Sequence, residues 1–532
     1  MFEDASLTGK QWLLPAGGTQ DIAGIVAQLL RTRKLDTPIA PPVFPNMEQV
    51  VERITAAVQR KEQIAIFGDY DCDGITATAQ LVRFFRRKGM DPLVRLPHRI
   101  RDGYGLRPAI IEEFHLAGIE LLITVDNGIS ATEEIALAKE YGIDTLITDH
   151  HAVGEDIPPA TLVLHPELAG CPGPHPSGAG VVFLLLEALE KGTWEERPID
   201  MVLAMCGTVA DLVELRGYNR QLVREGTQAL QQIKSGPLAL LRDSTGARTS
   251  TDIAFRVAPR INAAGRMADP LLALEALLSG GNSLAELDEL NIQRQQQMHE
   301  LYDEVQSSID KTSALLFAAD KSYPHGLIGL IAGRLTEATG HPSCVVTIEG
   351  EECTASLRSP ACYHITKGLA RCTDLLTRFG GHAQAAGCNF PLRNVEALQK
   401  KLSEDIALHT DKQDLQPSIQ IDAFLVPENI TLAFCKALET LEPFGAGNPE
   451  PRFLLEGVEL EGVKAVGKDG THLQCSAVGC KAIGFGLASL QNDLHVPLDV
   501  LCRLQIDEWN GHAQPQLIID DVRVAKRAPV RY

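Results

Sequence analysis

The sequence lacks the features that would place the protein in a membrane or outside the cell. Its 532 residues contain no run of about 18 apolar residues, so no membrane-spanning helix is expected. The N-terminus, Met-Phe-Glu-Asp-Ala-Ser, lacks the basic and then apolar pattern of a signal peptide. None of the 12 cysteines forms a CxxC pair, which argues against a zinc site and a disulfide framework. We therefore expect a cytoplasmic protein with no membrane partner.

Basic residues are too few for a protein that coats nucleic acid without specificity. The chain has 49 Lys and Arg against 69 Asp and Glu, a net charge of −20. The charge is uneven, because residues 83–107 hold eight basic side chains and only two acidic ones. For the run 83–88, a solvated helix face is as good an explanation as a phosphate-binding surface. Arg99 and Arg101, expected in a loop, favour phosphate binding.

The most informative stretch is Ile64-Ala-Ile-Phe-Gly-Asp-Tyr-Asp-Cys-Asp-Gly74. Residues 64–67 are typical of a short buried strand. Asp69, Asp71 and Asp73 then alternate, and at the period of a strand their side chains would project to one side. Because unpaired carboxylates are costly to bury, this pattern predicts a divalent cation.

Two other interpretations of this stretch compete with a metal site. An EF-hand loop begins with the same D-x-D-x-D-G pattern, but it needs a preceding helix and a glutamate at its twelfth position, which is Gln80 here. A solvated acidic turn would need no metal. The polar residues found after later strands argue against such a turn.

From residue 47 onward the sequence alternates between helical and strand-like segments. Helices are expected over 47–60, 76–88, 108–117 and 131–141, and strands over 64–67, 93–96, 121–125, 145–148 and 161–165. This alternation predicts an α/β fold with a doubly wound parallel sheet, whose functional crevice lies at the carboxyl ends of the strands. Asp126, Asp149, His150 and His151 follow two of these strands. Asp211 follows the apolar run 201–210, where an ionisable residue is costly unless it is paired or bound to metal.

These motifs resemble those of the DHH phosphoesterase family. The matching motifs are D-x-D-x-D-G at 69–74, D-N-G at 126–128, D-H-H at 149–151 and the late Asp211. The stretches 326–334, 355–359 and 380–387 look like the associated DHHA1 domain, and 262–267 and 443–449 resemble the family members that degrade single-stranded DNA. The resemblance covers nearly the whole chain. Phe67 departs from it, because several relatives have histidine there, and this removes the support for an extra ligand.

The resemblance implies a site for two Mn²⁺ or Mg²⁺ ions, and carboxylates with imidazole but no thiolate suit such cations. It assigns Asp71 to one ion, Asp73, His150 and Asp211 to the other, and Asp126 to a bridging position. It also implies that Asp149 orients a histidine and that His151 stabilises negative charge on the substrate. Asp69 is a further candidate, either as a ligand or as a supporting group.

The resemblance also implies residues that bind the substrate. Arg266, Ser356 and Arg358 are expected to hold a 5′ phosphate, because arginine binds phosphate through two parallel hydrogen bonds. Gly381 and His382 lie in a glycine-rich turn whose backbone N–H groups would approach phosphate. Arg101 is a further candidate. In the competing interpretation, Arg266 and Arg358 only pair with acidic residues at a domain interface.

The rest of the chain is expected to form further domains. The predicted order is an N-terminal extension (1–46), the DHH domain with the parallel sheet (47–280), a long connecting helix (281–311), a smaller α/β DHHA1 domain (312–410), a linker (411–451) and an OB-type β-barrel (452–532). Five strand-like runs indicate the barrel, a common binder of single strands. Its nine basic and ten acidic residues make it nearly neutral, which suits nucleic acid. Exposed aromatic residues such as Trp509 would stack on bases.

The resemblance therefore implies a divalent-metal-dependent 5′–3′ exonuclease that hydrolyses phosphodiester bonds of single-stranded DNA and releases mononucleotides, in DNA repair and recombination. Its partners would be single-stranded DNA, a helicase and a single-strand binding protein. One alternative is a relative that cuts oligoribonucleotides or cyclic dinucleotides; the long helix and the barrel argue against it. The other is a catalytically inactive DNA-binding scaffold, against which the unbroken set of ligand candidates argues.

Overall fold

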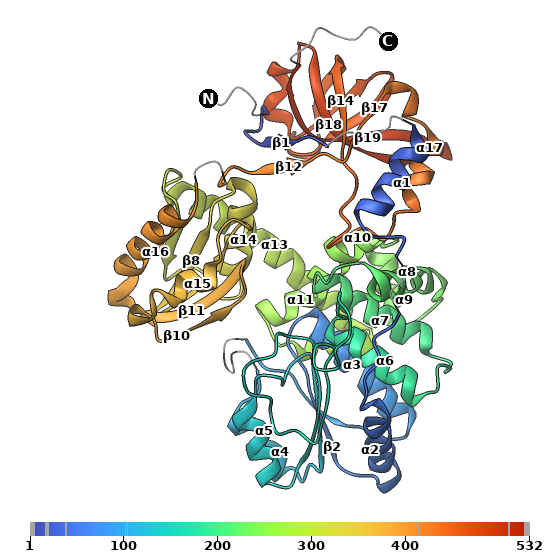
Figure 1. Cartoon of the computed structure of the whole chain (residues 1–532), viewed down its shortest axis with the longest axis vertical. Helices are drawn as coiled ribbons and strands as arrows, with labels where there is room; N and C mark the ends of the chain where they lie inside the picture. Colours follow the sequence, from blue (N-terminus) through green and yellow to red (C-terminus); the bar gives the residue numbers. More distant parts are fainter. Residues whose placement is uncertain are drawn as a thin grey trace. The chain divides into compact units, whose positions relative to one another are not determined.

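The computed structural model describes residues 6–15, 21–37, 40–99, 101, 103, 105–411, 414–508 and 511–525 (Figure 1). Trp509 lies outside the described residues. The chain forms two compact units. The first unit comprises Thr37–Gln297 and Pro443–Pro449; the second comprises Met1–Asp36, Met298–Glu442 and Glu450–Tyr532. In the described part of the chain, no helix is long and apolar enough to cross a membrane.

A five-stranded parallel sheet forms the centre of the first unit. Its strands are β2 (Ile64–Phe67), β3 (Leu93–Arg95), β4 (Leu121–Val125), β5 (Asp144–Thr148) and β6 (Leu162–Leu164). They lie in the order β3-β2-β4-β5-β6, and each neighbouring pair is parallel. From β2 the chain adds β3 on one side and then β4, β5 and β6 on the other. The strand order therefore switches between β2 and β4, which is the point where ligands bind in open α/β sheets. The predicted doubly wound sheet is confirmed.

Helices cover both faces of this sheet. The helices α4 (Pro108–Leu116) and α5 (Thr132–Glu140) pack on one face, where Phe114 and Ile135 share a buried cluster with Phe67 and Ile147. On the other face lie α2 (Met47–Arg60), α3 (Cys72–Arg87) and α6 (Gly178–Leu189) (Figure 1). Burial on both faces explains why the central strands are continuous apolar runs.

The helix α3 begins four residues earlier than predicted, at Cys72. Asp71 is its N-cap, and its carboxylate accepts hydrogen bonds from the N–H groups of Asp73 (3.0 Å) and Gly74 (3.1 Å). Asp73 therefore lies in the first turn of a helix. The prediction that an extended strand turns the three aspartates to one side was wrong, because the capping preference of aspartate ends the extended backbone there.

The remaining helices of the first unit follow the sheet. They are α7 (Arg197–Ala210), α8 (Gly217–Gln232), α9 (Pro237–Thr245), α10 (Ser250–Asp252), a π-helix (Ile253–Val257), α11 (Ala258–Met267) and α12 (Leu271–Ser279). The long helix α13 (Asn282–Ser308) occupies the segment where one long helix was expected. The boundary between the two units falls inside α13, after Gln297.

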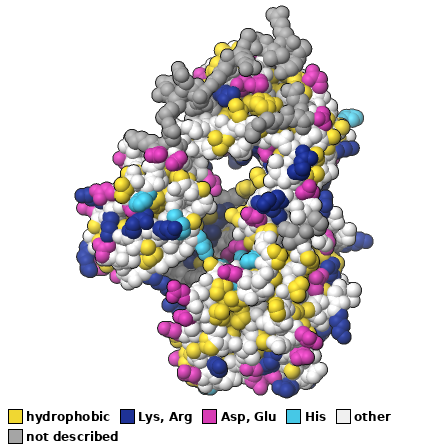
Figure 2. All heavy atoms as spheres, in the orientation of Figure 1, with side chains coloured by type: hydrophobic (Ala, Val, Ile, Leu, Met, Phe, Trp, Pro, Cys, Tyr) yellow, Lys and Arg dark blue, Asp and Glu magenta, His cyan; other side chains and the backbone are white. Residues whose placement is uncertain are grey.

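The basic residues at the end of α3 form ion pairs. Arg83 and Arg87 contact Asp200 of α7 at 2.9 and 3.1 Å, and Lys88 contacts Glu190 at 2.9 Å. Asp200 is fully buried, so its charge needs these partners. Arg83, Arg87 and Lys88 thus form ion pairs within the fold, which neither interpretation of the sequence had predicted. On the face of the molecule shown in Figure 2, basic and acidic side chains are interspersed.

The second unit contains a smaller mixed sheet. It comprises β7 (Leu316–Asp320), β8 (Ser343–Glu349), β9 (Glu352–Arg358), β10 (Arg378–Gly381) and β11 (Ala385–Pro391), in the order β10-β11-β9-β8-β7. Only β7 and β8 pair in parallel among these strands. The helix α14 (Ile328–Thr339) packs on β8 and β9. The short α15 (Ile365–Ala370) and α16 (Val395–His409) contribute to the buried cluster of this sheet.

A seven-stranded sheet forms the barrel. It contains β13 (Ala423–Phe424), β14 (Phe453–Val458), β15 (Leu460–Val466), β16 (His472–Ala477), β17 (Cys480–Gly484), β18 (Leu498–Asp507) and β19 (Gln514–Val524). The order is β13-β14-β18-β19-β17-β16-β15, and only Glu459 separates β14 from β15. Strands β14 and β15, which are far apart in the strand order, are thus directly connected in the chain. The five predicted strands are present; β13 and β15 were not predicted.

Segments before and between the predicted domains also pack on the barrel. The strand β1 (Gln11–Leu13) pairs with β12 (Ser418–Gln420), and Trp12 lies in a buried cluster with Leu454 and Leu501. The indole N–H of Trp12 donates to Asp521 at 2.9 Å. The helix α1 (Ile22–Thr32) contacts α17 (Leu432–Glu439). Residues up to 36 of the expected extension and 411–442 of the expected linker belong to the second unit, whereas 37–46 and 443–449 belong to the first.

Candidate metal centre

The acidic motifs meet at the carboxyl ends of β2 and β4, the two strands between which the order reverses. Asp69 and Asp71 follow β2, and Asp126 follows β4. The backbone of Asp126 has φ = 60°, a left-handed conformation that aspartate tolerates better than most residues. Its N–H donates to the carbonyl of Thr148 at 2.9 Å, so this unusual backbone is held by the neighbouring strand.

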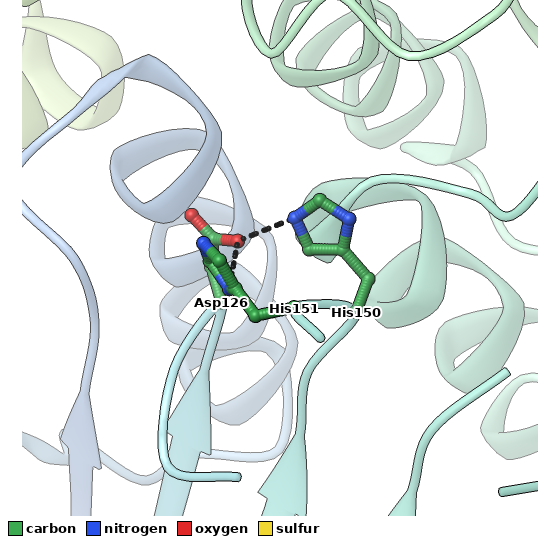
Figure 3. A group of neighbouring side chains, drawn as sticks. All are labelled: Asp126, His150 and His151. Atoms are coloured by element: carbon green, nitrogen blue, oxygen red, sulfur yellow. Dashed lines mark ion pairs between the residues drawn. The ribbon is translucent and has the colours of Figure 1, made fainter. Parts of the chain in front are cut away.

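Two histidines reach Asp126 from the loop that follows β5 (Figure 3). The Nε2 atom of His150 lies 3.1 Å from Oδ1 of Asp126, 3.5 Å from Asp211 and 3.7 Å from Asp73. The Nδ1 atom of His151 lies 3.9 Å from the same oxygen of Asp126. The structure thus brings both histidines close to carboxylates. The members of this cluster are spread over more than 80 residues of the sequence.

Asp149 holds the loop that carries these histidines. One of its oxygens accepts the N–H groups of His150 (2.7 Å) and His151 (3.1 Å) and lies 2.8 Å from the His151 ring; the other accepts the N–H of Ile129. Burial raises the pKa of Asp149, but the hydrogen bonds and the charge of His151 outweigh burial and lower it. For His151, burial lowers the pKa, but Asp149 outweighs it and raises the value to about 9. The pair is therefore charged at neutral pH.

Three overlapping groups of side chains are close enough to hold a cation. They are Asp73–His150–Asp211, Asp69–Asp71–Asp126 and Asp126–His150–His151, with the possible ligand atoms of each group within 4.8 Å of one another. Asp126 and His150 each belong to two groups. Because the groups overlap, they could hold two neighbouring cations.

The electrostatics of these groups fit divalent cations. Oδ1 of Asp126 and Nε2 of His150 are buried without a hydrogen-bond partner among the described residues. Burial and the neighbouring carboxylates raise the pKa of Asp126 well above its ordinary value, and those of Asp69 and Asp211 to about 8. So many buried carboxylates cannot all ionise without a compensating positive charge. Oxygen ligands with one imidazole suit Mn²⁺ and Mg²⁺.

The N-terminus of α6 fixes Asp73, a contact that sequence reasoning missed. The backbone N–H groups of Gly178 and Ala179 donate to the two Asp73 oxygens at 2.7 and 3.0 Å. Ser177 is the N-cap of α6. The N–H groups at a helix N-terminus bind anionic groups, so α6 orients this carboxylate. The sequence signal was Ser-Gly-Ala-Gly at 177–180, an N-cap followed by small residues.

Glycines let the backbone approach these carboxylates closely. A Cβ on Gly178 would lie 2.6 Å from Oδ1 of Asp126, and one on Gly207 would lie 2.3 Å from Oδ1 of Asp73. A Cβ on Gly74 would meet the backbone of Asp69 at 2.5 Å. At these positions any larger side chain must displace a member of the site.

Residues of α11 and a neighbouring loop support the turn after β2. The side chain of Asn262 accepts the N–H of Cys72 at 2.8 Å, and the guanidinium of Arg99 lies 4.4 Å from the centre of the Tyr70 ring. Arg266 is half-buried, and burial followed by the charges of Arg99 and Arg294 lowers its pKa to about 9. Arg101, in contrast, is exposed and faces Asp269 at 3.7 Å. Sequence reasoning had not found the roles of Asn262 and Tyr70.

Three family models match the chain: the DHH family N-terminal domain over residues 63–210, the DHHA1 domain over 311–408 and the RecJ OB domain over 421–521. The single-stranded-DNA-specific exonuclease RecJ of Bacillus subtilis (strain 168) is 32% identical to this chain over 95% of this chain and 68% of its own length. The chain belongs to the RecJ family. The resemblance seen in the sequence motifs is thereby confirmed.

Solved RecJ structures share the fold. The crystal structure of RecJ from Thermus thermophilus in complex with Mn²⁺ is 30% identical, has a TM-score of 0.85 and covers 97% of this chain and 80% of that one. The structure of that RecJ with Mg²⁺ is 28% identical, has a TM-score of 0.78 and covers 98% and 79%. The DHH, DHHA1 and OB-type architecture predicted for this RecJ-family chain is confirmed.

The other predicted substrate-binding residues lie in the second unit of this RecJ-family chain, whereas Arg101 and Arg266 belong to the first. On β9, Nη1 of Arg358 donates to Oγ of Ser356 (3.2 Å) and to the carbonyl of Leu357 (2.9 Å). Gly381 pairs with Ala386 across β10 and β11, and the N–H of His382 donates to Ala385 at 2.8 Å. Because β11 also pairs with β9, Ser356, Arg358 and Gly381 belong to one sheet, and His382 directly follows its strand β10.

We expect cation binding to release protons from this RecJ-family chain at neutral pH. Asp69 and Asp211 have pKa values of about 8, so without cations both hold protons at pH 7 and lose them when a cation binds. At pH 9.5 both are ionised beforehand, and fewer protons should leave. Calorimetric titration with Mg²⁺ in buffers of different ionisation enthalpy measures the number released.

The Asp69→Asn variant provides the matched control, because an amide cannot release a proton. This variant should release fewer protons than the wild type at pH 7 and the same number at pH 9.5. A binding enthalpy that does not depend on the buffer at pH 7 would contradict the raised pKa values.

Proposed function

We propose that this chain is a divalent-metal-dependent exonuclease that hydrolyses the phosphodiester bonds of single-stranded DNA from the 5′ end and releases mononucleotides. The observation that carries the proposal is the position of Asp126, buried within reach of His150 and between two groups of possible ligands. Family membership supports the substrate, because RecJ relatives are named single-stranded-DNA-specific exonucleases. The direction and the product are expectations from the same family.

The proposed ligands follow the observed groups. Asp73, His150 and Asp211 would hold one ion, Asp71 would hold the second with Asp69 beside it, and Asp126 would serve both. The Thermus relative, crystallised with Mn²⁺ and with Mg²⁺, supports these metals. A pair of divalent cations supplies Lewis-acid stabilisation of the phosphoryl group and lowers the pKa of water. The two hydrogen bonds from the N-terminus of α6 support this role for Asp73, because they fix its carboxylate.

His151 has a role in the proposal that is separate from metal binding. Its ring is partly exposed and is held by Asp149 at 2.8 Å, so it is oriented before substrate arrives. Asp149 helps raise its pKa to about 9, so in the absence of cations it carries a positive charge at neutral pH. A fixed positive group of this kind stabilises the negative charge that develops on a phosphate oxygen. Asp149 is the positioning residue for this histidine.

The decisive experiment compares substrates under controlled metal conditions. Single-stranded DNA labelled at the 5′ or the 3′ end, the same sequence as a duplex, and a cyclic dinucleotide are each incubated with Mn²⁺, Mg²⁺ or chelator. The proposal requires release of the 5′ label as a mononucleotide, from the single strand only, and none with chelator. Preferential cleavage of the dinucleotide would favour the alternative of a small-substrate phosphodiesterase. Binding of DNA without cleavage would favour the inactive scaffold.

The Ser356–Arg358 pair is proposed to bind the terminal phosphate. The two side chains already contact one another on β9 and offer a hydroxyl and a guanidinium, both donors to phosphate. We expect Arg358→Ala to reduce the preference for 5′-phosphorylated over 5′-hydroxyl strands about tenfold, since a charge-assisted hydrogen bond contributes about 1.5–3 kcal/mol. Cleavage of the two strand types by both proteins measures this preference.

Arg378→Ala provides a control, because Arg378 is an exposed arginine of the same sheet, on β10. It should keep the wild-type preference. An unchanged preference in Arg358→Ala would show that the terminal phosphate binds elsewhere. Arg101, Arg266, Gly381 and His382 complete the proposed substrate contacts, each within its own unit.

The proposal extends to the biological setting and to the division of the chain. We place the enzyme in DNA repair and recombination in the cytoplasm, with a helicase that supplies single strands and a single-strand binding protein. The proposed division has catalytic residues in 47–280, the DHHA1 domain in 312–410 and the barrel in 452–532. Co-purification with tagged protein from cells, with and without nuclease treatment, tests the two protein partners.

A further inference from the structure

A third histidine, His165, is buried behind the loop that carries His150 and His151. It lies directly after β6 and is 1% exposed. Its Nε2 atom lies 2.8 Å from the carbonyl oxygen of His151. A carbonyl oxygen can only accept a hydrogen bond, so Nε2 of His165 is the donor. Burial lowers the pKa of His165, so at neutral pH the ring is neutral and its single proton is on Nε2.

The other ring nitrogen of His165 has no comparable contact. Nδ1 is buried and has no hydrogen-bond partner among the described residues. His165 also belongs to none of the three groups of side chains that could hold a cation. An apolar side chain would fill this space without burying an unbonded nitrogen, which is costly. The hydrogen bond to His151 is therefore what a histidine contributes at this position.

The end of β6 holds the loop 149–151 at both of its ends. At the start of the loop, the N–H of Asp149 donates to the carbonyl of Leu164, the last residue of β6, at 3.2 Å. Within the loop, Oδ1 of Asp149 contacts the N–H groups of both histidines and the His151 ring. None of these bonds involves the carbonyl of His151, through which the chain leaves the loop. His165, the residue after Leu164, supplies that bond.

We propose that His165 is a positioning residue for His151. Asp149 fixes the N–H and the ring of His151, and His165 fixes its carbonyl, so the residue is held on both sides of its Cα atom. This inference rests on the proposed function, in which His151 contacts the substrate, and adds the residue that sets its position. Misplacement of a reacting group by about 1 Å costs about 10²-fold in rate, so a remote hydrogen bond can matter.

Removal of the donor should lower the rate of the chemical step without weakening substrate or metal binding. His165→Leu should reduce kcat for single-stranded DNA by about 10–10²-fold and leave KM near that of the wild type. The affinity for Mg²⁺, measured by calorimetry, should also stay near the wild-type value, because the N–H of His150 is still held by Asp149. A kcat equal to that of the wild type in a folded His165→Leu variant would overturn the proposal.

Two amide variants separate positioning from a general effect on the fold. Glutamine carries its amide nitrogen as many bonds from Cβ as Nε2 of histidine, so His165→Gln should restore most of kcat. Asparagine carries its amide nitrogen at the distance of Nδ1 and is too short to reach the His151 carbonyl, so His165→Asn should remain slow. Melting temperatures measured for both variants show that each is folded. Equal kcat values in the two variants would overturn the proposal.

A double-mutant cycle tests whether His165 acts through His151. In a chain that already carries His151→Ala, the further change His165→Leu should alter kcat by less than about twofold, because the group that it positions is gone. If the two effects on kcat multiply instead, His165 acts independently of His151 and the proposal fails.

A measurement on the metal-free chain needs no activity. In the full chain labelled with ¹⁵N in histidine only and kept in chelator, the ring signals that disappear in His165→Gln belong to His165. They should show a proton on Nε2, slow to exchange with solvent, and none on Nδ1. A proton on Nδ1 would overturn the inference. If the wild type cleaves single-stranded DNA but any of these tests fails, the proposed function stands and the role of His165 falls. A wild type that cuts no single strands with either metal overturns the proposed function, and the role of His165 with it.

Discussion

Replacing Asp126 with alanine should abolish hydrolysis and leave the protein folded. Asp126 is the carboxylate shared by two of the three candidate groups, and its Oδ1 lies 3.1 Å from His150. In the proposed assignment, neither ion would have its full ligand set without it. Lewis-acid stabilisation is worth several kcal/mol and each 1.36 kcal/mol is tenfold in rate, so the rate should fall by more than about 10³-fold. Cleavage of end-labelled single-stranded DNA under metal saturation measures the loss.

The His151→Ala variant separates loss of metal binding from loss of a contact with the substrate. His151 lies farther from Asp126, at 3.9 Å, and is held by Asp149. If it acts on the substrate, its loss should lower the rate by about 10²–10³-fold. Metal affinity, measured by calorimetry, should stay near that of the wild type in His151→Ala and fall in Asp126→Ala. Equal loss of metal affinity in both variants would place His151 among the ligands.

Much of the site was predictable because parallel sheets bring strand ends together. Once Ile64–Phe67 and Leu121–Val125 are recognised as buried strands, the polar residues that follow them must lie at one edge. This argument alone placed Asp126 near the aspartates that follow β2. The π-helix at Ile253–Val257 shows the opposite case: the short sequence Ile-Ala-Phe-Arg-Val carries no signal for it.

What the sequence did not reveal depends on backbone positions far from the motifs. The N-terminus of α6 binds Asp73 across 105 residues of chain. The local sequence Ser177-Gly178 does not indicate which carboxylate the N-terminus of α6 contacts. The start of α3 was also misjudged, because Asp71 was interpreted as a ligand only, although its carboxylate also caps the helix. The amino-acid type alone does not show that one residue has two structural roles.

Gly178→Ala should inactivate the enzyme as a purely steric effect. The added methyl group would lie 2.6 Å from both Cβ and Oδ1 of Asp126, closer than atoms can approach. Asp126 has little freedom to move, since its left-handed backbone is tied to Thr148 at 2.9 Å. A displacement of about 1 Å at a reacting centre costs about 10²-fold in rate. We expect a loss of at least that size, with weaker metal binding, in the cleavage and calorimetric assays described for Asp126→Ala.

The Gly154→Ala variant separates this steric effect from a general effect of replacing glycine. Gly154 lies in the same unit, and a Cβ there would have no neighbour within 4 Å. It should retain full activity. Overpacking destabilises a core by about 1–3 kcal/mol, so Gly178→Ala should still fold, with a somewhat lower melting temperature. If Gly178→Ala loses its cooperative thermal transition, the defect is global; if it folds and remains active, the close approach of α6 to Asp126 does not set the position of that carboxylate.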